Sequence, residues 1–527
     1  MVAMIVLAIL ALLGLLLMTA GAGVAGVVGS DDTVFNRPAE LGPDGRPVLT
    51  SPGLLAYDGV TITLRASAPG GVFIGTAHPV DVSDFVAESS RIRLTRVTRD
   101  GVRSEDIGSA EPVRPASVDF WTHSMTGQGV EELTLEGDAE AAQWVIAPIS
   151  GQGPTTVSFG VTVPGLFRRA LIAFGLGALL LVVSVELLIR TRRRGPRSSA
   201  PSPASHRGRR KAPRTRRRRG VSLMLALSLP LSLTGCRWDD LLPAQPHAEE
   251  LAATKVALTR AELPALLTSY DARLRRAAQA AKAPGYRSDS WRLVDRGPAL
   301  ESDLFETRVA KLTGLGVALP SSHQPVGVYS ARFTSYPMWT IVASRTGGDE
   351  RLDLFTKASV QAPWLRQAGT TVSLDLPEAA RPSRVPDNDK VAAATAAWQD
   401  YLRSGTSPDG LEVDRDSKVW RDNVTDLGGR AMFRGVNVVV QPAGKSGLSR
   451  VVEVEDGELA IVALRVTTRL AGRGDLQVEW NPPYGKYRPS KDGVLSFADL
   501  AVGVIYLPTK GPATLLGSSF SEVAVTP

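Results

Sequence analysis

Two long stretches of the chain consist mostly of apolar residues. Residues 1–30 and 166–190 each exceed the roughly 20 helical residues that cross a hydrocarbon core of about 30 Å. In the first stretch, Gly21, Ala25 and Gly29 recur at every fourth position, the spacing that lets two membrane helices pack closely. The pattern predicts two transmembrane helices.

Between these stretches, residues 31–165 alternate between apolar and polar positions. Val60, Ile62 and Leu64 point to the same face of a strand, and comparable alternations follow along the segment. Glycines and prolines interrupt it, and no helical period persists. We therefore predict an all-β, sandwich-like domain over residues 31–165.

The C-terminal half mixes helical and strand periods. Leu263 to Ala281 is predicted to form an amphipathic helix, with a capping-box spacing at its start between Thr259 and Glu262. Strands are predicted at Val326–Phe333, Met338–Ser344, Arg351–Ser359, Thr371–Leu376, Val436–Val440, Arg450–Glu455, Glu458–Leu470, Leu476–Trp480, Phe497–Leu507 and Thr514–Val525. We expect two α+β halves, 256–378 and 379–527, each with a helix laid on an antiparallel sheet. The sequence leaves open whether they are a duplication.

Positive charge is concentrated in one segment between the two parts. Residues 190–219 contain 14 arginines and lysines and no acidic residue, with prolines and serines between them. The whole chain carries a formal charge of +7, so removing these 14 cations leaves −7. Because the basic character is local, it argues against a nucleic-acid-binding domain.

We predict that residues 191–220 form a disordered cytoplasmic loop, because basic residues beside apolar spans are retained inside. The topological signal is assigned to Arg192, Arg193, Arg194, Arg216, Arg217, Arg218 and Arg219. This orientation places the β domain outside the cytoplasm and the N-terminus inside.

A short apolar segment, residues 221–236, follows the arginines and ends at the only cysteine of the chain. The 15 residues before Cys236 span only about 22 Å as a helix, which is too short to cross a hydrocarbon core of about 30 Å. A basic region, a short apolar region and small residues describe a signal peptide. The residues before the cysteine resemble the bacterial lipobox, in which the thiol receives a diacylglyceryl group; they are Leu233, Thr234 and Gly235.

Lipidation at Cys236 would make residues 237–255 a tether for the C-terminal domain. The alternative is that residues 221–236 remain a third transmembrane segment with a buried cysteine. The C-terminal domain lies outside the cytoplasm in both cases.

Two parts of the sequence resemble actinobacterial families of unknown function. The first resemblance, to membrane proteins with an extracytoplasmic β domain between two helices, is carried by Phe73–Ala77, Asp81, Phe85, Asp119–Trp121 and Gln143–Ile146. The second, to lipoproteins and membrane-anchored proteins, is carried by Tyr270, Gly297–Leu300, Tyr336–Trp339, Leu354–Ala358, Ala362–Trp364 and Asp456–Leu459. Both resemblances imply location and fold, and neither implies an activity.

Side chains capable of catalysis are scattered along the sequence. The five histidines show no metal-ligand spacing, and the Gly517-Ser518-Ser519 stretch lacks a nucleophile elbow. We predict no catalytic residue, no metal and no cofactor. Asp414, Asp416 and Asp422 alternate with basic residues, which is typical of a solvated helix face.

The loop from Asn481 to Tyr487 is rigid, aromatic and basic, so it is a candidate contact site for a partner through Tyr484, Lys486 and Tyr487. We expect a non-catalytic cell-envelope protein whose two membrane-anchored modules bind a protein, glycan or lipid. The alternative is an extracytoplasmic hydrolase acting on cell-wall or lipid substrates.

Overall fold

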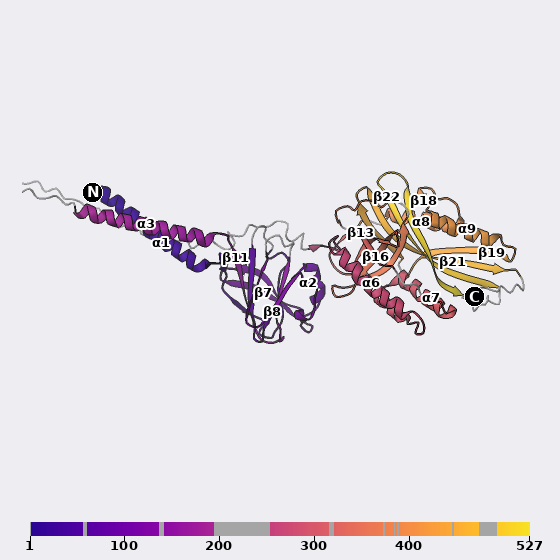
Figure 1. The fold of residues 1–527 in the computed structure, drawn as a ribbon, viewed down its shortest axis with the longest axis horizontal. Helices are drawn as coiled ribbons and strands as arrows, with labels where there is room; N and C mark the ends of the chain where they lie inside the picture. The colour runs from indigo at the N-terminus through magenta and orange to yellow at the C-terminus, as the bar shows by residue number, and fades with distance from the viewer. Residues whose placement is uncertain are drawn as a thin grey trace, which may run out of the picture. The chain divides into compact units, whose positions relative to one another are not determined.

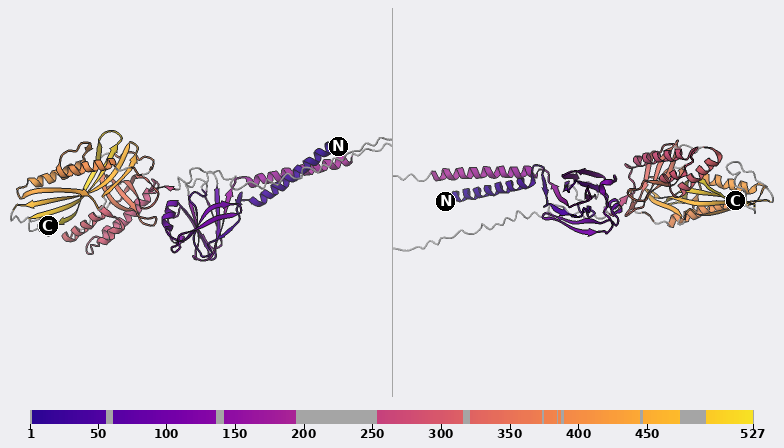
Figure 2. Two further views of the ribbon diagram at one scale, coloured as in Figure 1. Left: turned by 180° about the vertical axis from the view of Figure 1, so that it is seen from behind. Right: turned by 90° about the horizontal axis from the view of Figure 1, so that it is seen from below.

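The chain divides into two compact units. The computed structural model describes residues 2–55, 61–135, 142–193, 253–315, 321–372, 375–383, 385–386, 389–444, 447–473 and 493–526. One unit comprises Met1–His78 and Glu88–Glu249, and the other comprises Pro79–Ala87 and Glu250–Pro527. The ribbon is drawn in Figures 1 and 2.

The first unit contains two helices that are long and apolar enough to cross a membrane. These helices, α1 (Val2–Val28) and α3 (Leu166–Arg193), agree with the two predicted spans. They lie side by side in every view of Figures 1 and 2.

Glycines hold α1 and α3 close together. A Cβ atom added at Gly14 would lie 2.8 Å from the Gly177 carbonyl oxygen, and one at Gly21 would lie 2.6 Å from the Phe174 nitrogen. Gly21 belongs to the stripe predicted from the sequence, while the contact between Gly14 and Gly177 extends it along the pair. Small residues therefore permit contact between the two helix backbones.

The other described residues of the first unit form a β-sandwich. Its strands are β1 (Thr33–Phe35), β2 (Ala39–Leu41), β3 (Val48–Thr50), β4 (Thr61–Ser67), β5 (Val72–Ala77), β6 (Arg91–Thr98), β7 (Gly101–Ile107), β8 (His123–Gly127), β9 (Val130–Leu135), β10 (Gln143–Pro148) and β11 (Thr155–Thr162). One sheet has the order β1-β11-β4-β9, with β2 also on β11, and the other has the order β7-β6-β3-β10-β5-β8. Leu64 and Phe159 of the first sheet share a buried core with Ile74 and Trp144 of the second. The expected sheet-rich domain is confirmed.

One helix interrupts the segment that was expected to contain only strands. Helix α2 (Pro79–Val86) belongs to the second unit, so that expectation is wrong at this point. A proline at its first position and Asp81 in its first turn favour a helix start. In the second unit, the Tyr336 hydroxyl donates a hydrogen bond of 2.8 Å to Asp81, which also pairs with Lys255.

The second unit has four layers: helices, sheet, sheet, helices (Figure 1). The first sheet has the order β13-β15-β16-β17, and the second has the order β18-β23-β22-β21-β19, with β20 also on β21. The strands are β13 (Gln324–Ser330), β15 (Met338–Thr346), β16 (Asp349–Lys357), β17 (Leu365–Val372), β18 (Leu411–Glu412), β19 (Phe433–Pro442), β20 (Leu448–Val454), β21 (Gly457–Gly472), β22 (Val494–Pro508) and β23 (Ala513–Thr526); β12 (Lys255–Val256) and β14 (Arg332–Phe333) form a small separate pair. Ile341 and Leu354 of the first sheet pack with Ile461 and Val504 of the second.

Helices cover the outer face of each sheet. Helices α6 (Leu263–Ala280) and α7 (Gly297–Thr313), with the 3-10 helix η3 (Ser288–Leu293), cover the first sheet. Helices α8 (Asp389–Ser404) and α9 (Arg415–Gly429) cover the second. Gly503 makes room for Trp398 of α8, because a Cβ there would lie 2.7 Å from the indole ring.

The two halves repeat the same order of elements. In the second half, β20 pairs with Gly457–Ala463 and β19 with Leu464–Gly472, so the two strands lie end to end along β21. Counted as one strand, they begin a meander that continues through β21, β22 and β23. Each half therefore contains two α-helices followed by a four-stranded antiparallel meander, and the second half adds β18 between its helices.

Most predicted strands of this unit are present within a few residues of their expected bounds. The strand expected at Thr371–Leu376 is the exception, because β17 ends at Val372. Leu376 still packs against the central core, which explains why its alternation with Val372 resembled a strand. The strand expected at Leu476–Trp480 lies outside the described residues.

Candidate functional site

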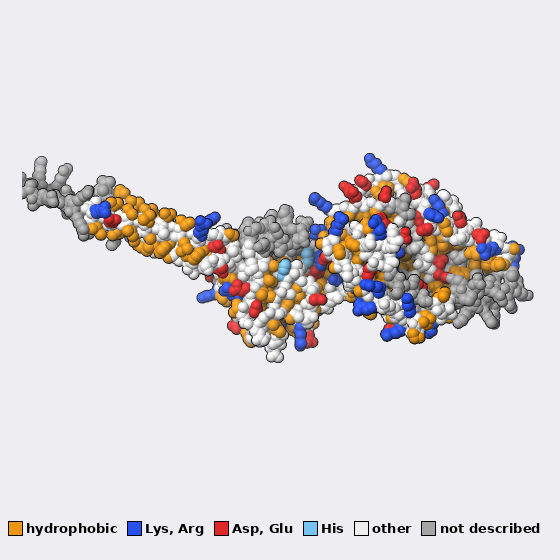
Figure 3. All heavy atoms as spheres, viewed as in Figure 1, with side chains coloured by type: hydrophobic (Ala, Val, Ile, Leu, Met, Phe, Trp, Pro, Cys, Tyr) orange, Lys and Arg blue, Asp and Glu red, His pale blue; other side chains and the backbone are white. Residues whose placement is uncertain are grey.

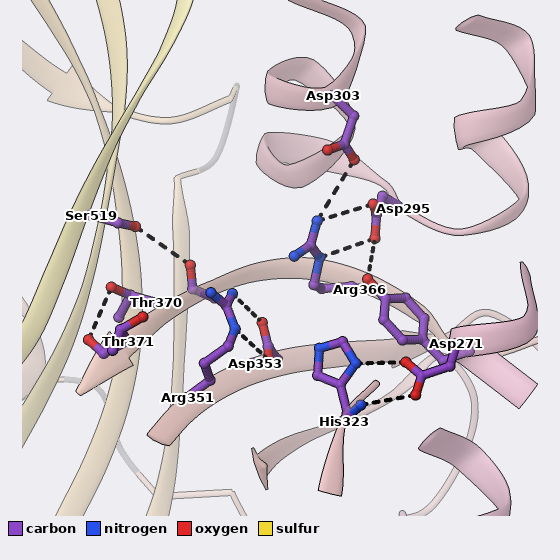
Figure 4. Close-up of polar contacts among 12 residues, drawn as sticks. Asp271, Asp295, Asp303, His323, Arg351, Asp353, Arg366, Thr370, Thr371 and Ser519 are labelled. Carbon is purple, nitrogen blue, oxygen red and sulfur yellow. Dashed lines mark hydrogen bonds and ion pairs between the residues drawn. The ribbon is translucent and has the colours of Figure 1, made fainter. Parts of the chain in front are cut away.

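A cluster of charged side chains, buried or partly buried, lies between the first sheet of the second unit and helices α6 and α7 (Figure 4). We call it the charged cluster; its members are Tyr270, Asp271, Asp295, Asp303, His323, Arg351, Asp353 and Arg366. None of these residues was predicted from the sequence to be functional, although Tyr270 is among the residues that carry the second resemblance. Buried charges are rare unless they are paired, so the cluster is the strongest candidate site among the described residues.

Arg366 of β17 lies at the centre of the charged cluster. Its Nε and Nη2 atoms donate hydrogen bonds of 3.1 Å each to the two carboxylate oxygens of Asp295, which follows η3. Nη2 also lies 3.7 Å from an oxygen of Asp303 on α7. The Tyr270 hydroxyl adds a hydrogen bond of 3.3 Å to Asp295. The two-pronged geometry matches a guanidinium to a carboxylate and offsets part of their desolvation.

The backbone fixes this arrangement as well. The amide of Arg366 donates to the Val294 carbonyl at 3.1 Å, and the amide of Arg296 donates to the Arg366 carbonyl at 2.9 Å. Asp295 therefore enters the sheet layer beside β17 through main-chain bonds. The pairing of its side chain with Arg366 follows from that register.

Burial sets the protonation of one carboxyl in the cluster. Desolvation, together with the neighbouring Asp295, raises the pKa of Asp303 to about 9 despite the opposing effect of Arg366. Asp303 is therefore neutral at pH 7. Burial also raises the pKa of Tyr270 well above its ordinary value, so its hydroxyl remains a donor.

A second pair joins α6 to the start of β13. His323 Nδ1 lies 2.6 Å from one oxygen of Asp271, and the His323 amide donates to the other oxygen at 2.9 Å. Both side chains are almost fully buried, at 6% and 9% exposed. The Tyr270 ring meets the imidazole edge-on, with 5.5 Å between centroids. Enzymes use such a carboxylate to orient a general base, and structural proteins use it to fix a loop.

The third pair lies on β16. Arg351 Nη2 donates to Asp353 at 3.1 Å, and Asp353 is almost completely buried. This pair lies within one strand, whereas the pairs of Arg366 and His323 join α7 and α6 to the sheet and to the residue before β13. Asp271, Asp295 and Asp353 each accept hydrogen bonds from an amide, a hydroxyl or a guanidinium of the same protein, whereas Asp303 Oδ2 lies 3.7 Å from Arg366 and accepts no hydrogen bond from the described residues.

The second half contains a smaller polar network at the start of α9. Asp414 is the N-cap residue and accepts from the Ser417 amide at 3.2 Å. Ser518 of β23 donates to Asp414 at 2.8 Å, and Trp398 donates to the Ser417 hydroxyl at 3.0 Å. Asp416 and Asp422, which were predicted to lie on a solvated helix face, are exposed on α9.

Most of the sites predicted from the sequence lie outside the described residues. These are Cys236, Leu233, Thr234 and Gly235, the loop residues Tyr484, Lys486 and Tyr487, and Arg194, Arg216, Arg217, Arg218 and Arg219. Arg192 and Arg193 are the last two residues of α3. Within the described ranges, no group of three or more histidine, cysteine or acidic residues is arranged to hold a metal ion.

No protein-family model, curated protein or solved structure matches the chain.

Proposed function

We propose that this chain is a cell-envelope protein whose two membrane-anchored modules lie outside the cytoplasm and bind a partner without catalysing a reaction. Two transmembrane helices and a lipid on Cys236, or a third span, would attach it. The partner is a protein or an envelope polymer, and nucleic acid is not among its ligands.

The observation that carries the proposal is the join between the apolar helix pair and the β-sandwich. Asp32, between α1 and β1, accepts hydrogen bonds from the Gly165 and Phe167 amides at the start of α3, at 2.8 and 2.7 Å. Strand β1 is also paired with β11, which leads into α3. Both helices therefore connect to neighbouring strands of one sheet, an arrangement that suits a domain held firmly at a membrane surface.

The charged cluster supports a binding role more than a catalytic one. Its groups pair with one another across three elements, and such pairing rigidifies a scaffold. A rigid platform loses little conformational entropy when a partner binds. The arginine-rich segment supports the orientation, because basic loops are retained in the cytoplasm.

The alternative is an extracytoplasmic hydrolase of wall or lipid substrates, and the pairing of His323 with Asp271 favours it. An imidazole held at 2.6 Å by a carboxylate has the geometry of an oriented general base. In that case His323 would activate a water molecule.

One experiment separates the two candidates. The purified full chain and its His323→Gln variant are incubated with membrane lipids and with cell-wall fragments, and product release is followed by mass spectrometry. The proposal expects no turnover above the buffer blank from either protein. Turnover by the wild type that is lost in His323→Gln, with an unchanged melting temperature, would establish the hydrolase instead.

A further inference from the structure

The outer side of α6 and η3 is strongly basic. Residues 273–292 contain six arginines and lysines and one acid, Asp289. The acids on either side, Asp271 and Asp295, are buried and paired within the charged cluster. The exposed charge of this stretch is therefore positive, and Figure 3 shows Lys and Arg side chains over this part of the second unit.

Four of these cations lie on α6 or along the segment that ends in an exposed leucine, Leu293. Arg273 Nε donates to the Leu293 carbonyl at 3.1 Å, which brings the end of η3 beside α6. The Arg287 amide donates to the Ala280 carbonyl at 2.8 Å, one helical turn beyond Arg276. We call this surface the α6–η3 patch; it consists of Arg273, Arg276, Arg287, Arg292 and Leu293.

The charges of the patch are largely unneutralised by the protein. Arg276 and Arg292 form no ion pair with any residue in the described ranges. Arg273 donates to two carbonyls and the Ser269 hydroxyl, none of which is charged. Arg287 meets Asp289 at 3.4 Å with both side chains 68% exposed, a weak pair in water.

Leu293 distinguishes the patch from an ordinary solvated basic surface. Its side chain is 65% exposed, although it follows the buried Trp291 by only two residues. Arginines around an exposed aliphatic side chain match a lipid interface: the guanidinium groups meet phosphates, and the apolar side chain enters the boundary with the acyl chains. An anionic polymer would engage the arginines and leave the leucine in water.

We propose that the α6–η3 patch binds the anionic lipid surface of the membrane to which the chain is attached. The inference rests on the proposed membrane attachment, which keeps the patch at high effective concentration near lipid. Each arginine near an anionic surface changes the ratio of lipid-bound to free patch by about fivefold, and added salt screens this attraction.

The test uses the full chain in vesicles. Cys236→Ala removes the native thiol, and Ser290→Cys in η3 carries an environment-sensitive fluorophore. The protein is reconstituted in vesicles of phosphatidylcholine alone, or of equal parts phosphatidylcholine and phosphatidylglycerol. Brominated acyl chains in either vesicle quench the fluorophore when η3 reaches the lipid.

We expect quenching in the anionic vesicles at low salt, and its loss at high salt or in phosphatidylcholine alone. Arg276→Gln with Arg292→Gln should lower the lipid-bound ratio about 25-fold, at about fivefold per arginine. Leu293→Ser should also reduce quenching at low salt, because the apolar contact with the acyl chains is lost. The matched control removes two exposed arginines of the other half, Arg403→Gln and Arg430→Gln, and should leave quenching unchanged.

Three results would overturn the inference: no quenching in anionic vesicles, equal quenching in both vesicles, or equal effects of the patch and control variants. If soluble polyglutamate shifts the fluorescence while anionic vesicles do not quench it, the patch binds a polymer. Flotation separates this outcome from failure of the proposed function. A chain that floats with vesicles without quenching contradicts the patch alone, whereas a chain that does not float contradicts the membrane attachment.

Discussion

Arg366 and Asp295 are 71 residues apart in the chain, yet they meet through two hydrogen bonds of 3.1 Å inside the second unit. They also face each other in a backbone bridge. The pair thereby joins the segment between η3 and α7 to the sheet by both main chain and side chain. Both side chains are largely buried, so removing one partner leaves the other as a buried charge that neither a counterion nor water compensates.

Arg366→Met should destabilise the second unit by about 3–5 kcal/mol, the usual effect of leaving a buried charge unpaired. Adding Asp295→Leu should recover part of the loss, because the orphaned carboxylate is then gone. Denaturant unfolding of the full chain in detergent, followed by tryptophan fluorescence, measures both. Arg403→Met is the matched control, since its pair with Asp400 is exposed and contributes about 1 kcal/mol or less. Equal losses at the two positions would contradict a structural role for the buried pair.

Asp303 should make stability depend on pH in a direction opposite to that of most carboxyls. The pKa of Asp303 is about 9 in the folded protein, whereas its ordinary value is 3.8. Unfolding therefore releases a proton at any pH between these two values. The stabilisation from this group is complete below pH 3.8 and is lost as pH rises through 9.

Asp303→Asn is neutral at every pH, so it should gain stability relative to the wild type as pH rises from 5 to 8, by at most about 1.4 kcal/mol per pH unit. Melting temperatures of both proteins across this range measure the difference, in which other titrating groups cancel. Asp289→Asn, at an exposed acid, should show no such trend. A difference that stays constant with pH would mean that Asp303 is ionised in the folded protein.

The contact between α1 and α3 should not tolerate a side chain at Gly14 or Gly177. The nearest backbone atoms would lie 2.8 and 2.5 Å from an added Cβ, so Gly14→Leu or Gly177→Leu forces the helices apart. We expect lower abundance in membranes and a lower melting temperature in detergent. Gly23→Leu and Gly175→Leu are the controls, because no atom lies within 4 Å of a Cβ there. Comparable losses in all four variants would show that the helices do not pack as described.

Cys236 should be the site of processing and lipidation. If so, the chain is cut before Cys236, and mass spectrometry of the native membranes finds two fragments, the second carrying a diacylglyceryl group. Cys236→Ala should then leave one full-length species. A wild type found only as the intact, unlipidated chain would instead make residues 221–236 a third span.

Hydrophobic pattern predicted those elements that are apolar along one face or over most of their length. Helix α6 is of the first kind; the apolar spans and the long strands β21 and β22, which are buried on both faces, are of the second. Strand β17 was missed over most of its length because Arg366 and Gln367 interrupt its apolar pattern, although both are held by partners inside the protein. Polar residues that are buried and paired therefore obscure the apolar pattern by which a strand is predicted.

The charged cluster could not have been predicted either, because its members are far apart in the sequence. His323 and Asp271 are separated by 52 residues, and no local pattern indicates that α6 and the start of β13 meet. Helix α2 was missed because it has only eight residues, and its valines at alternate positions resemble a strand. Only the tertiary arrangement supplies these pairings.

The central claim is that both folded modules lie outside the cytoplasm and the arginine-rich segment lies inside. Labelling of intact cells with a membrane-impermeant maleimide tests it most directly. Three variants of the Cys236→Ala chain carry one new cysteine each, at Ser104 in the β-sandwich, at Ser407 after α8, or at Ser202 in the arginine-rich segment. We predict that Ser104→Cys and Ser407→Cys are labelled before lysis and that Ser202→Cys is labelled only after lysis. Labelling of Ser202→Cys on intact cells, or protection of either module until lysis, would contradict the account.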